Sequence, residues 1–395
     1  MLETPGEALG ERGRSAGRQL PGWLCGLVVL TLVYLFLVGI KLMGVSFKLF
    51  GEDFRRLVST TDNPMVGLFF GVLVTAIARS SSLTTSIAVG LVAGGEMTLA
   101  NAIPIIMGAN VGTSVNNTLV ALMHVRRRDE FRRAFAGAIV HDLFNWCTVL
   151  VFFPIECVTR WYFGVGYLER LSLWLTDVFV GAKTVGAFRP LGYVIDPVVD
   201  AAKHLLLTTL GLSAGWAAAV LIVGSLALLI GVLFGITVVM RGLVAGKFEL
   251  FLDRFLFRNA FIAYMVGMLV TAVVQSSSVT TSLVVPLLGA GLLTVEQIYP
   301  YTIGANVGTT ITAFLASLAV MAEGALGRLG FTVALVHLLF NAHGAAVFFP
   351  LRMIPIGTAR WYANLAADRP RYAAFFILGV FFVLPIVVIG VMRLL

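Results

Sequence analysis

Residues 75–86 read TAIARSSSLTTS and residues 271–282 read TAVVQSSSVTTS, so one hydroxyl-rich stretch occurs twice, 196 positions apart. The spacing is kept farther along the chain by three more pairs of motifs: GANVGT at 108–113 and 304–309, HDLFN at 141–145 with HLLFN at 337–341, and FFP at 152–154 and 348–350. Polar breaks at matched positions inside apolar segments are typical of membrane transporters built from internal repeats. The chain is therefore predicted to consist of two related halves.

The amino-acid composition places these halves in a membrane. Apolar residues make up 59% of the chain and charged residues 12%, whereas a soluble domain carries about 25% charged residues. Strand-like alternation is absent, which favours helices over a barrel. The sequence therefore predicts an all-α, multi-pass integral membrane protein. Seven segments approach the ~20 residues that a membrane-crossing helix needs: 23–43, 99–123, 134–153, 215–240, 299–320, 331–350 and 373–395.

Each half is predicted to contain a spanning helix, a broken hydroxyl-rich hairpin at 65–95 or 261–291, and two more spanning helices. Serine and threonine side chains form hydrogen bonds with nearby backbone groups, in competition with the hydrogen bonds of a helix. Runs of these residues therefore favour helix ends. Irregular backbone at membrane depth survives only where it faces protein or water. Five parts are expected: a disordered cytoplasmic tail at 1–21, membrane repeat one at 22–155, an extracytoplasmic connector at 156–213, membrane repeat two at 214–350, and a cytoplasmic-side loop with a C-terminal membrane helix at 351–395.

The charges favour an inverted arrangement of the two halves. Segment 126–133 carries five arginines, which is typical of a cytoplasmic loop. Its counterpart in the second half, around 321–330, carries only Glu323 and Arg328. The same element is therefore expected on opposite sides of the membrane, giving two inverted-topology repeats, each with a re-entrant or broken hairpin.

Several function classes have no support in the sequence. It has no catalytic constellation, metal-ligand spacing, phosphate-binding loop or dinucleotide-binding turn, so we expect no enzyme activity and no cofactor. Three cysteines give no disulfide framework. The net charge of +8 is attributed to topology, and no basic patch with interleaved aromatics suggests nucleic acid. The expected partners are the lipid bilayer, a transported solute and a coupling ion, and the sequence indicates no oligomeric state.

The two serine runs are the strongest candidates for chemistry. A half-helix N-terminus presents unpaired N–H groups and a partial positive charge, which suits an anion. Hydroxyls and released carbonyls are oxygen donors that suit an alkali cation. Gln275, Ser276, Thr309 and Thr312 could together form such a cation site, since Thr312 lies one helical turn after Thr309. The alternatives are that these hydroxyls only pack helices closely or cap a helix break.

Two charged residues stand in apolar surroundings. Asp142 interrupts an apolar helix, and a carboxylate buried in a membrane marks an ion path by default. The alternative is an ion pair with Arg132 or Arg133. Arg79 stands where the second half has Gln275, and its guanidinium could bind an oxyanion in a bidentate way or pair with a carboxylate such as Asp142. The matched histidines, His141 and His337, are expected to be packing hydrogen-bonders.

At this level of detail the sequence resembles the type II sodium-dependent phosphate cotransporter family, in a bacterial-type short form. The motifs that carry the resemblance are paired and long: 80–86, 103–114, 131–138, 141–146, 274–278 and 302–310. The resemblance implies symport of sodium with inorganic phosphate in the plasma (inner) membrane. It also implies that Asp142, with Ala136 and Ala138, accompanies electrogenic transport with an additional sodium. Arg79 departs from the family, whose members usually have Gln there.

With these implications, two sets of site residues are predicted. The sodium-binding set is Gln275, Ser276, Thr309, Thr312, Asp142 and Asn306, and sodium is the only metal expected. The phosphate-binding set is Arg79, Ser80, Ser81, Ser82, Ser276, Ser277, Ser278, Asn110 and Thr113. The leading hypothesis is a secondary active symporter working by alternating access. A sodium-coupled carrier of another oxyanion, such as arsenate or sulfate, and a channel or non-transporting sensor are the alternatives.

Overall fold

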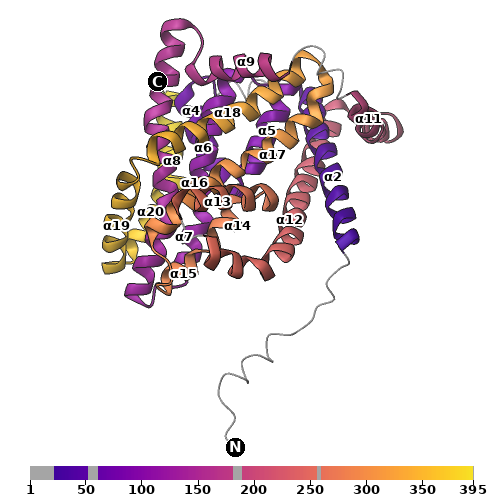
Figure 1. The fold of residues 1–395 in the computed structure, drawn as a ribbon. Coiled ribbons are helices and arrows are strands. Elements are labelled where there is room, and N and C mark those ends of the chain that lie inside the picture. Colours follow the sequence, from indigo (N-terminus) through magenta and orange to yellow (C-terminus); the bar gives the residue numbers. More distant parts are fainter. Residues whose placement is uncertain (1–21, 52–60, 181–188, 256–258, 395) are drawn as a thin grey trace, which may run out of the picture.

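The computed structural model describes residues 22–51, 61–180, 189–255 and 259–394 of the 395-residue chain. The predicted tail at 1–21 lies outside these ranges. Within them every regular element is a helix, as Figure 1 shows, in agreement with the all-α class.

The helices follow one another in a single chain order. The first half holds α2 (Gly22–Phe50), α4 (Pro64–Ala78), α5 (Ser81–Gly94), α6 (Leu99–Gly112), α7 (Val115–Leu122) and α8 (Arg128–Phe163). Next come α9 (Tyr167–Phe179), α11 (Arg189–His204) and the π-helix η1 (Leu205–Thr209). The second half holds α12 (Ala214–Phe255), α13 (Ala260–Val274), α14 (Ser277–Ser282), α15 (Val285–Gly289), α16 (Val295–Gly308), α17 (Thr310–Val320), the 3-10 turn η2 (Met321–Glu323) and α18 (Ala325–Phe348). The chain ends with α19 (Met353–Asp368), α20 (Arg371–Leu378), the π-helix η3 (Gly379–Val383) and α21 (Leu384–Leu394).

In the described ranges, six helical stretches are long and apolar enough to cross a membrane: Trp23–Phe50, Arg128–Phe163, Ala214–Met240, Val295–Glu323, Ala325–Phe348 and Arg371–Leu394. Of the seven predicted spans, 99–123 is the one that is wrong as a continuous helix, because the chain breaks between α6 and α7. There Thr113 donates its hydroxyl to the Ala109 carbonyl (2.8 Å), and Ser114 leaves the helical range with φ −86° and ψ 0°. Helix α8 also continues past residue 155, where the first repeat was expected to end.

The internal repeat is visible in the helix boundaries. Helices α4 and α6 begin and end at the positions of α13 and α16 after a shift of 196 residues. Both pairs pack through glycine. A Cβ added to Gly71 would lie 2.2 Å from the Ile105 carbonyl oxygen, and one added to Gly267 would lie 2.0 Å from that of Tyr301. Since a side chain cannot fit at either glycine, the backbones within each pair are in direct contact.

Helices α2 and α12, which also correspond under this shift, pack against each other. Gly39 faces Leu228 and Leu229, while Gly235 faces Leu32. The residue numbers in contact rise along α2 as they fall along α12, so the two helices run antiparallel. They lie side by side in Figure 1. The contacts are also reciprocal, since Leu228 and Gly235 are the counterparts of Leu32 and Gly39.

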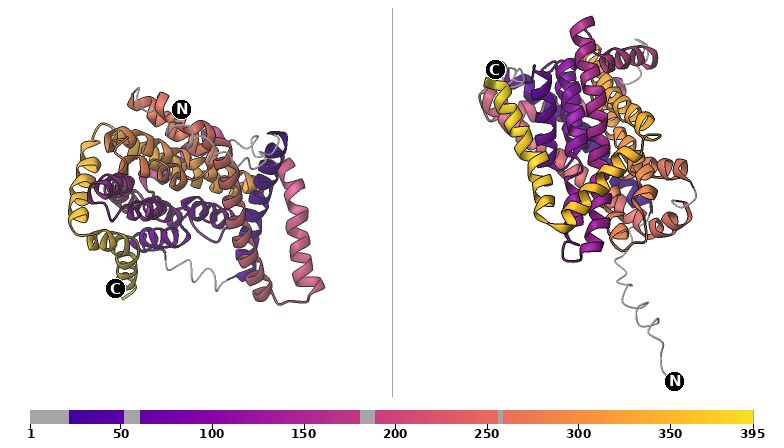
Figure 2. Two further views of the ribbon diagram at one scale, coloured as in Figure 1. Left: turned by 90° about the horizontal axis from the view of Figure 1, so that it is seen from below. Right: turned by 90° about the vertical axis from the view of Figure 1, so that its left-hand side faces the viewer.

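The remaining packing connects the two halves to each other. Helix α5 packs on α17 and α18 of the second half, and the corresponding α14 and α15 pack on α7 and α8 of the first. Figure 2 shows the purple helices of the first half lying along the orange helices of the second. Large buried side chains fill the space between them, among them Phe131, Phe135, Phe144, Phe340, Tyr299 and Tyr301. The halves therefore share one core, and the broken segments lie within it.

Candidate functional site

The site is organised by two helix breaks at matched positions. Helix α4 ends at Arg79 (φ 56°) and α13 ends at Gln275 (φ 57°), the only non-glycine residues with positive φ among those described. Ser80 and Ser276 then cap the next helices, their hydroxyls accepting from the N–H three residues on (3.2 and 3.4 Å). Left-handed backbone at a non-glycine residue costs on the order of 1–3 kcal/mol and is typical of functional sites.

The serine runs reach across to the other half. The Ser82 hydroxyl donates to the Gln275 carbonyl (3.2 Å) and lies 3.5 Å from Thr312 Oγ1. The Ser278 hydroxyl donates to the Thr113 carbonyl (3.0 Å) at the break between α6 and α7. Ser81 and Ser277 are also buried, and their carbonyls accept from threonine hydroxyls one turn later. Each run is therefore fixed against a helix break of the other half, the Ser82 run at the α13–α14 break and the Ser278 run at the α6–α7 break.

A cavity of about 440 Å³ opens where the two breaks meet. Its polar lining consists of Arg79, Ser80, Ser82, Asn116, Thr237, Gln275 and Ser276. Apart from Thr237, α12 contributes an apolar wall that includes Phe234. The cavity thus brings together five of the predicted site residues. The other nine predicted site residues do not line it: Ser81, Ser277, Ser278, Asn110, Thr113, Thr309, Thr312, Asp142 and Asn306.

The residues of the second half that were predicted to bind a cation differ in whether their side-chain oxygens already take part in hydrogen bonds. Gln275 Oε1 is buried, with no hydrogen-bond partner in the described part of the chain. Thr312 is fully buried and faces Ser82, whereas the Thr309 hydroxyl donates to the Ala305 carbonyl (3.0 Å). A buried acceptor without a donor costs about 1–3 kcal/mol. The Gln275 oxygen is therefore suited to a cation.

Two matched histidine–asparagine contacts connect the two halves. His141 Nε2 is 3.1 Å from Asn306 Oδ1, and His337 Nε2 is 3.3 Å from Asn110 Oδ1. The Asn306 amide nitrogen already donates to Asn145 (2.7 Å) and to a second asparagine, Asn341 (2.8 Å), so its oxygen accepts the proton on His141 Nε2. The hydrogen-bonding role predicted for both histidines is confirmed. Asn306, predicted as a sodium ligand, uses both amide N–H groups and one lone pair of its oxygen in this network.

Asp142 lies on α8 and is completely buried. The Ser114 hydroxyl is beside its carboxyl group, yet neither carboxyl oxygen has a hydrogen bond of normal geometry among the described residues. The alternative of an ion pair with Arg132 or Arg133 is wrong. Arg132 pairs with Asp129 (3.2 Å), and Arg133 donates to backbone carbonyls at the end of α15.

Arg79 does not pair with Asp142 either. Its Nε donates to Asn116 Oδ1, and Asn116 Nδ2 donates back to the Arg79 carbonyl (3.2 Å). The counter-ion alternative is therefore wrong as well, because this contact is with a neutral amide. Sequence reasoning missed Asn116, although the 196-residue shift pairs it with Thr312 and so signalled its place.

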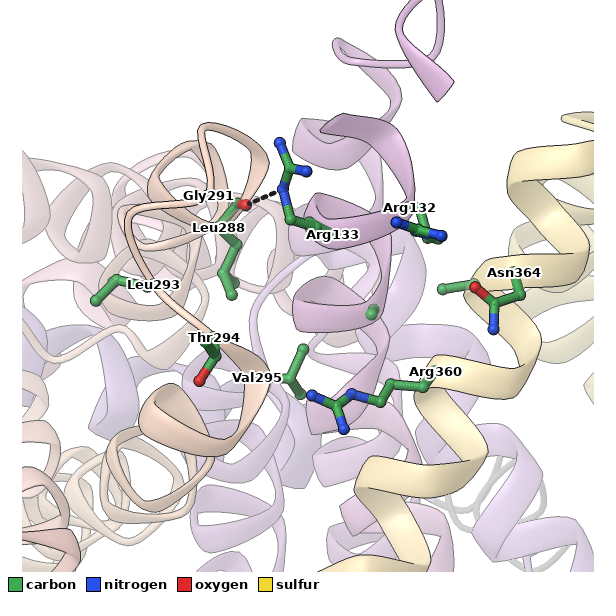
Figure 3. Close-up of a pocket in the computed structure, with 11 residues that line it drawn as sticks. Arg132, Arg133, Leu288, Gly291, Leu293, Thr294, Val295, Arg360 and Asn364 are labelled. Atoms are coloured by element: carbon green, nitrogen blue, oxygen red, sulfur yellow. Dashed lines mark hydrogen bonds between the residues drawn. The ribbon is translucent and has the colours of Figure 1, made fainter. Parts of the chain in front are cut away.

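A second cavity, of about 320 Å³, lies between α8, α16 and α19 and is drawn in Figure 3. Three arginines line it, Arg132, Arg133 and Arg360, but none of the predicted ligands does. Each guanidinium already has a carboxylate or carbonyl partner, Glu296 serving Arg360 at 2.6 Å. This cavity is therefore separate from the candidate site.

The comparisons with known proteins follow the two halves. A sequence profile described as Na+/Pi-cotransporter matches residues 35–168 and again residues 227–361. Each match includes one serine run and one GANVGT motif. The profile therefore covers both helix breaks and most of the membrane core.

Three curated proteins illustrate the similarity. The chain is 31% identical to sodium-dependent phosphate transport protein 2B of Pongo abelii and of Homo sapiens, over 92% of this chain and 65% and 64% of theirs. It is 33% identical to sodium-dependent phosphate transport protein 2A of Mus musculus, over 92% of this chain and 67% of that protein. The chain thus spans about two thirds of the length of these relatives. No solved structure was found to match it.

Proposed function

The chain belongs to the Na+/Pi-cotransporter family, and from this membership we propose that it is a secondary active symporter that couples sodium entry to the uptake of inorganic phosphate across the plasma membrane. The observation that carries the proposal is the meeting of two broken, hydroxyl-capped helices at one cavity. Half-helix ends supply N–H groups for an anion and oxygens for a cation at one place.

We also propose that the repeats are inverted and that the hairpins are re-entrant. The antiparallel, reciprocal contact of α2 with α12 supports the inversion, because two corresponding spanning helices that run in opposite directions require it. Helices α4 and α13 have 15 residues each, or about 22 Å of helix. A hydrocarbon core is about 30 Å thick. A helix of that length followed by a break supports a hairpin that enters the membrane and returns.

For the sodium sites, the proposed ligands are the predicted ones. The free Gln275 side-chain oxygen supports one ion at the second break, where Ser276 follows in the chain and Thr312 is linked to the Gln275 backbone carbonyl through Ser82; Thr309 would turn its hydroxyl to this ion. The unpaired Asp142 carboxyl supports a further ion, with Ser114 as an additional oxygen donor. Asn306 would join through the second lone pair of its side-chain oxygen, because the first accepts from His141.

For phosphate, the proposed contacts are Arg79 and the serines that line the cavity. Ser80, Ser82 and Ser276 supply hydroxyl groups there. Ser81, Ser277, Ser278, Asn110 and Thr113 lie outside the cavity, so they would meet phosphate only after a movement of the hairpins. Such a movement is what alternating access requires, and a carboxylate-held sodium would make transport electrogenic.

The test is uptake of radiolabelled phosphate into proteoliposomes containing the purified full-length chain. We expect accumulation with an inward sodium gradient and little with potassium in place of sodium. Uptake that is indifferent to sodium would contradict the proposal. Strong competition by sulfate or arsenate at concentrations below that of phosphate would favour the carrier of another oxyanion. Rapid equilibration without accumulation would favour a channel.

A further inference from the structure

The two helix breaks correspond residue by residue, but the first contains a charge that the second lacks. Shifting the proposed sodium ligands back by 196 positions leads from Gln275 to Arg79 and from Thr312 to Asn116. The other two members of the set keep their chemistry, since Ser276 corresponds to Ser80 and Thr309 to Thr113. The first break is therefore a copy of the second in which the neutral amide of Gln275 has become a guanidinium and Thr312 has become an asparagine.

The contacts differ in the same way. At the second break the Gln275 side-chain oxygen is buried and has no donor among the residues described. At the first break the corresponding backbone has the same left-handed conformation, but the available side-chain oxygen, Asn116 Oδ1, accepts from Arg79 itself. One break thus presents an acceptor to a cation, and the other supplies its own cation.

We propose that the Arg79 guanidinium is a built-in cation that occupies, in the first repeat, the place that a sodium ion occupies in the second. The inference rests on the proposed symport function. A fixed positive charge beside Asn116 repels a second cation and takes the oxygen that would bind it. Only one of the guanidinium's nitrogens donates to Asn116, which leaves the remaining N–H groups for an anion in the cavity that Arg79 lines.

The geometry makes a specific choice of variants possible. Arg79→Gln restores the residue of the second break and leaves the Asn116 oxygen free. The double variant Arg79→Gln/Asn116→Thr reproduces all four side chains of the proposed sodium site. Arg79→Lys keeps the charge and serves as the matched control, because it changes shape without opening the site to sodium.

The experiment measures phosphate uptake as a function of sodium concentration in proteoliposomes. If Arg79 replaces a sodium ion, Arg79→Gln raises the Hill coefficient for sodium by up to one, since one added site raises its upper limit by one. The double variant shows the same rise, while Arg79→Lys keeps the wild-type coefficient. An unchanged coefficient in both Gln variants, with only a higher apparent phosphate constant, would overturn the inference and leave Arg79 as a phosphate ligand alone.

A binding measurement gives a readout that is independent of transport. Sodium should raise the melting temperature of purified Arg79→Gln more steeply with concentration than that of the wild type, since a bound ligand stabilises the folded state by mass action. Equal sodium dependence of melting in the two proteins would contradict the inference. Failure of the symport proposal is seen separately, as wild-type uptake that ignores the sodium gradient.

Discussion

The two breaks use one backbone design with different side chains, and the difference separates what holds the fold from what binds solutes. At both breaks a left-handed residue is followed by a serine cap, and a glycine-packed helix pair lies alongside. The side chains then diverge. The second break has the neutral Gln275, whereas the first has Arg79 in the cavity and Asp142 facing the nearby α6–α7 break. We infer that the backbone is constrained by the fold and that the ion preference is set at a few exchangeable positions.

The largest effect is expected from removing the free side-chain oxygen of Gln275, which distinguishes the second helix break from the first. Gln275→Ala should reduce the apparent sodium affinity of phosphate uptake by about ten- to a hundredfold, the range expected for losing a bond to a charged group. Thr309→Ala should act in the same direction. The control is Ser317→Ala, because that buried hydroxyl bonds only the carbonyl of its own helix (2.7 Å). Uptake near the wild-type rate at limiting sodium in both Gln275→Ala and Thr309→Ala would refute the ligand assignment.

The asymmetry at α8 predicts an electrical difference. Asp142 has the apolar counterpart Leu338, so only the first repeat has a carboxylate at this position. Asp142→Asn keeps the shape and should lower the charge moved per phosphate by about one elementary charge if the carboxylate holds a sodium. The measurement is current and tracer uptake together in a voltage-clamped membrane, with the exposed Asp129→Asn as control. The same charge ratio in both variants would remove Asp142 from the ion sites.

Stability offers a test of the shared backbone design. Gly71→Ala and Gly267→Ala place a Cβ about 2 Å from a carbonyl oxygen in the partner helix, so each should destabilise by about 1–3 kcal/mol or more. Gly224→Ala is the control, since nothing lies within 4 Å of its added Cβ. Thermal melting of the purified protein measures the effect. If the two repeats share one packing design, Gly71→Ala and Gly267→Ala lower the melting temperature by similar amounts, and a loss in only one repeat would count against it.

Much of this design was readable from the sequence because it is local. Serine runs predicted the helix breaks, and the repeated motifs predicted which segments correspond. The hydrogen bonds between the two halves could not be predicted from the sequence. Those of His141 to Asn306 and of Ser82 to the Gln275 backbone carbonyl depend on how two separate groups of helices pack. The break within 99–123 was missed because its residues are apolar enough to span a membrane, and hydropathy does not signal the change of backbone at Ser114 that divides them. The contact between Arg79 and Asn116 likewise joins positions 37 residues apart.

The smallest expected effect lies where one repeat has a bond that the other lacks. The Tyr301 hydroxyl donates to the Thr280 carbonyl (3.2 Å), while the counterpart of Tyr301 in the first repeat is Ile105, which has no hydroxyl. Both side chains are buried, and both helices make the same glycine contact with their partner. Tyr301→Phe removes only the hydrogen bond, so unfolding should become easier by about 1 kcal/mol.

The control for this variant is Ile105→Val, a change that removes one methyl group at the matched position and costs about 0.5–1.5 kcal/mol through packing alone. The two variants should therefore melt at similar temperatures, and sodium should stabilise both as it stabilises the wild type. If Tyr301→Phe instead weakened the stabilisation by sodium, the hydroxyl would be positioning the α14 serine run for ion binding. The second break would then depend on a contact that has no equivalent in the first, and the two breaks would differ in how they are supported as well as in what they bind.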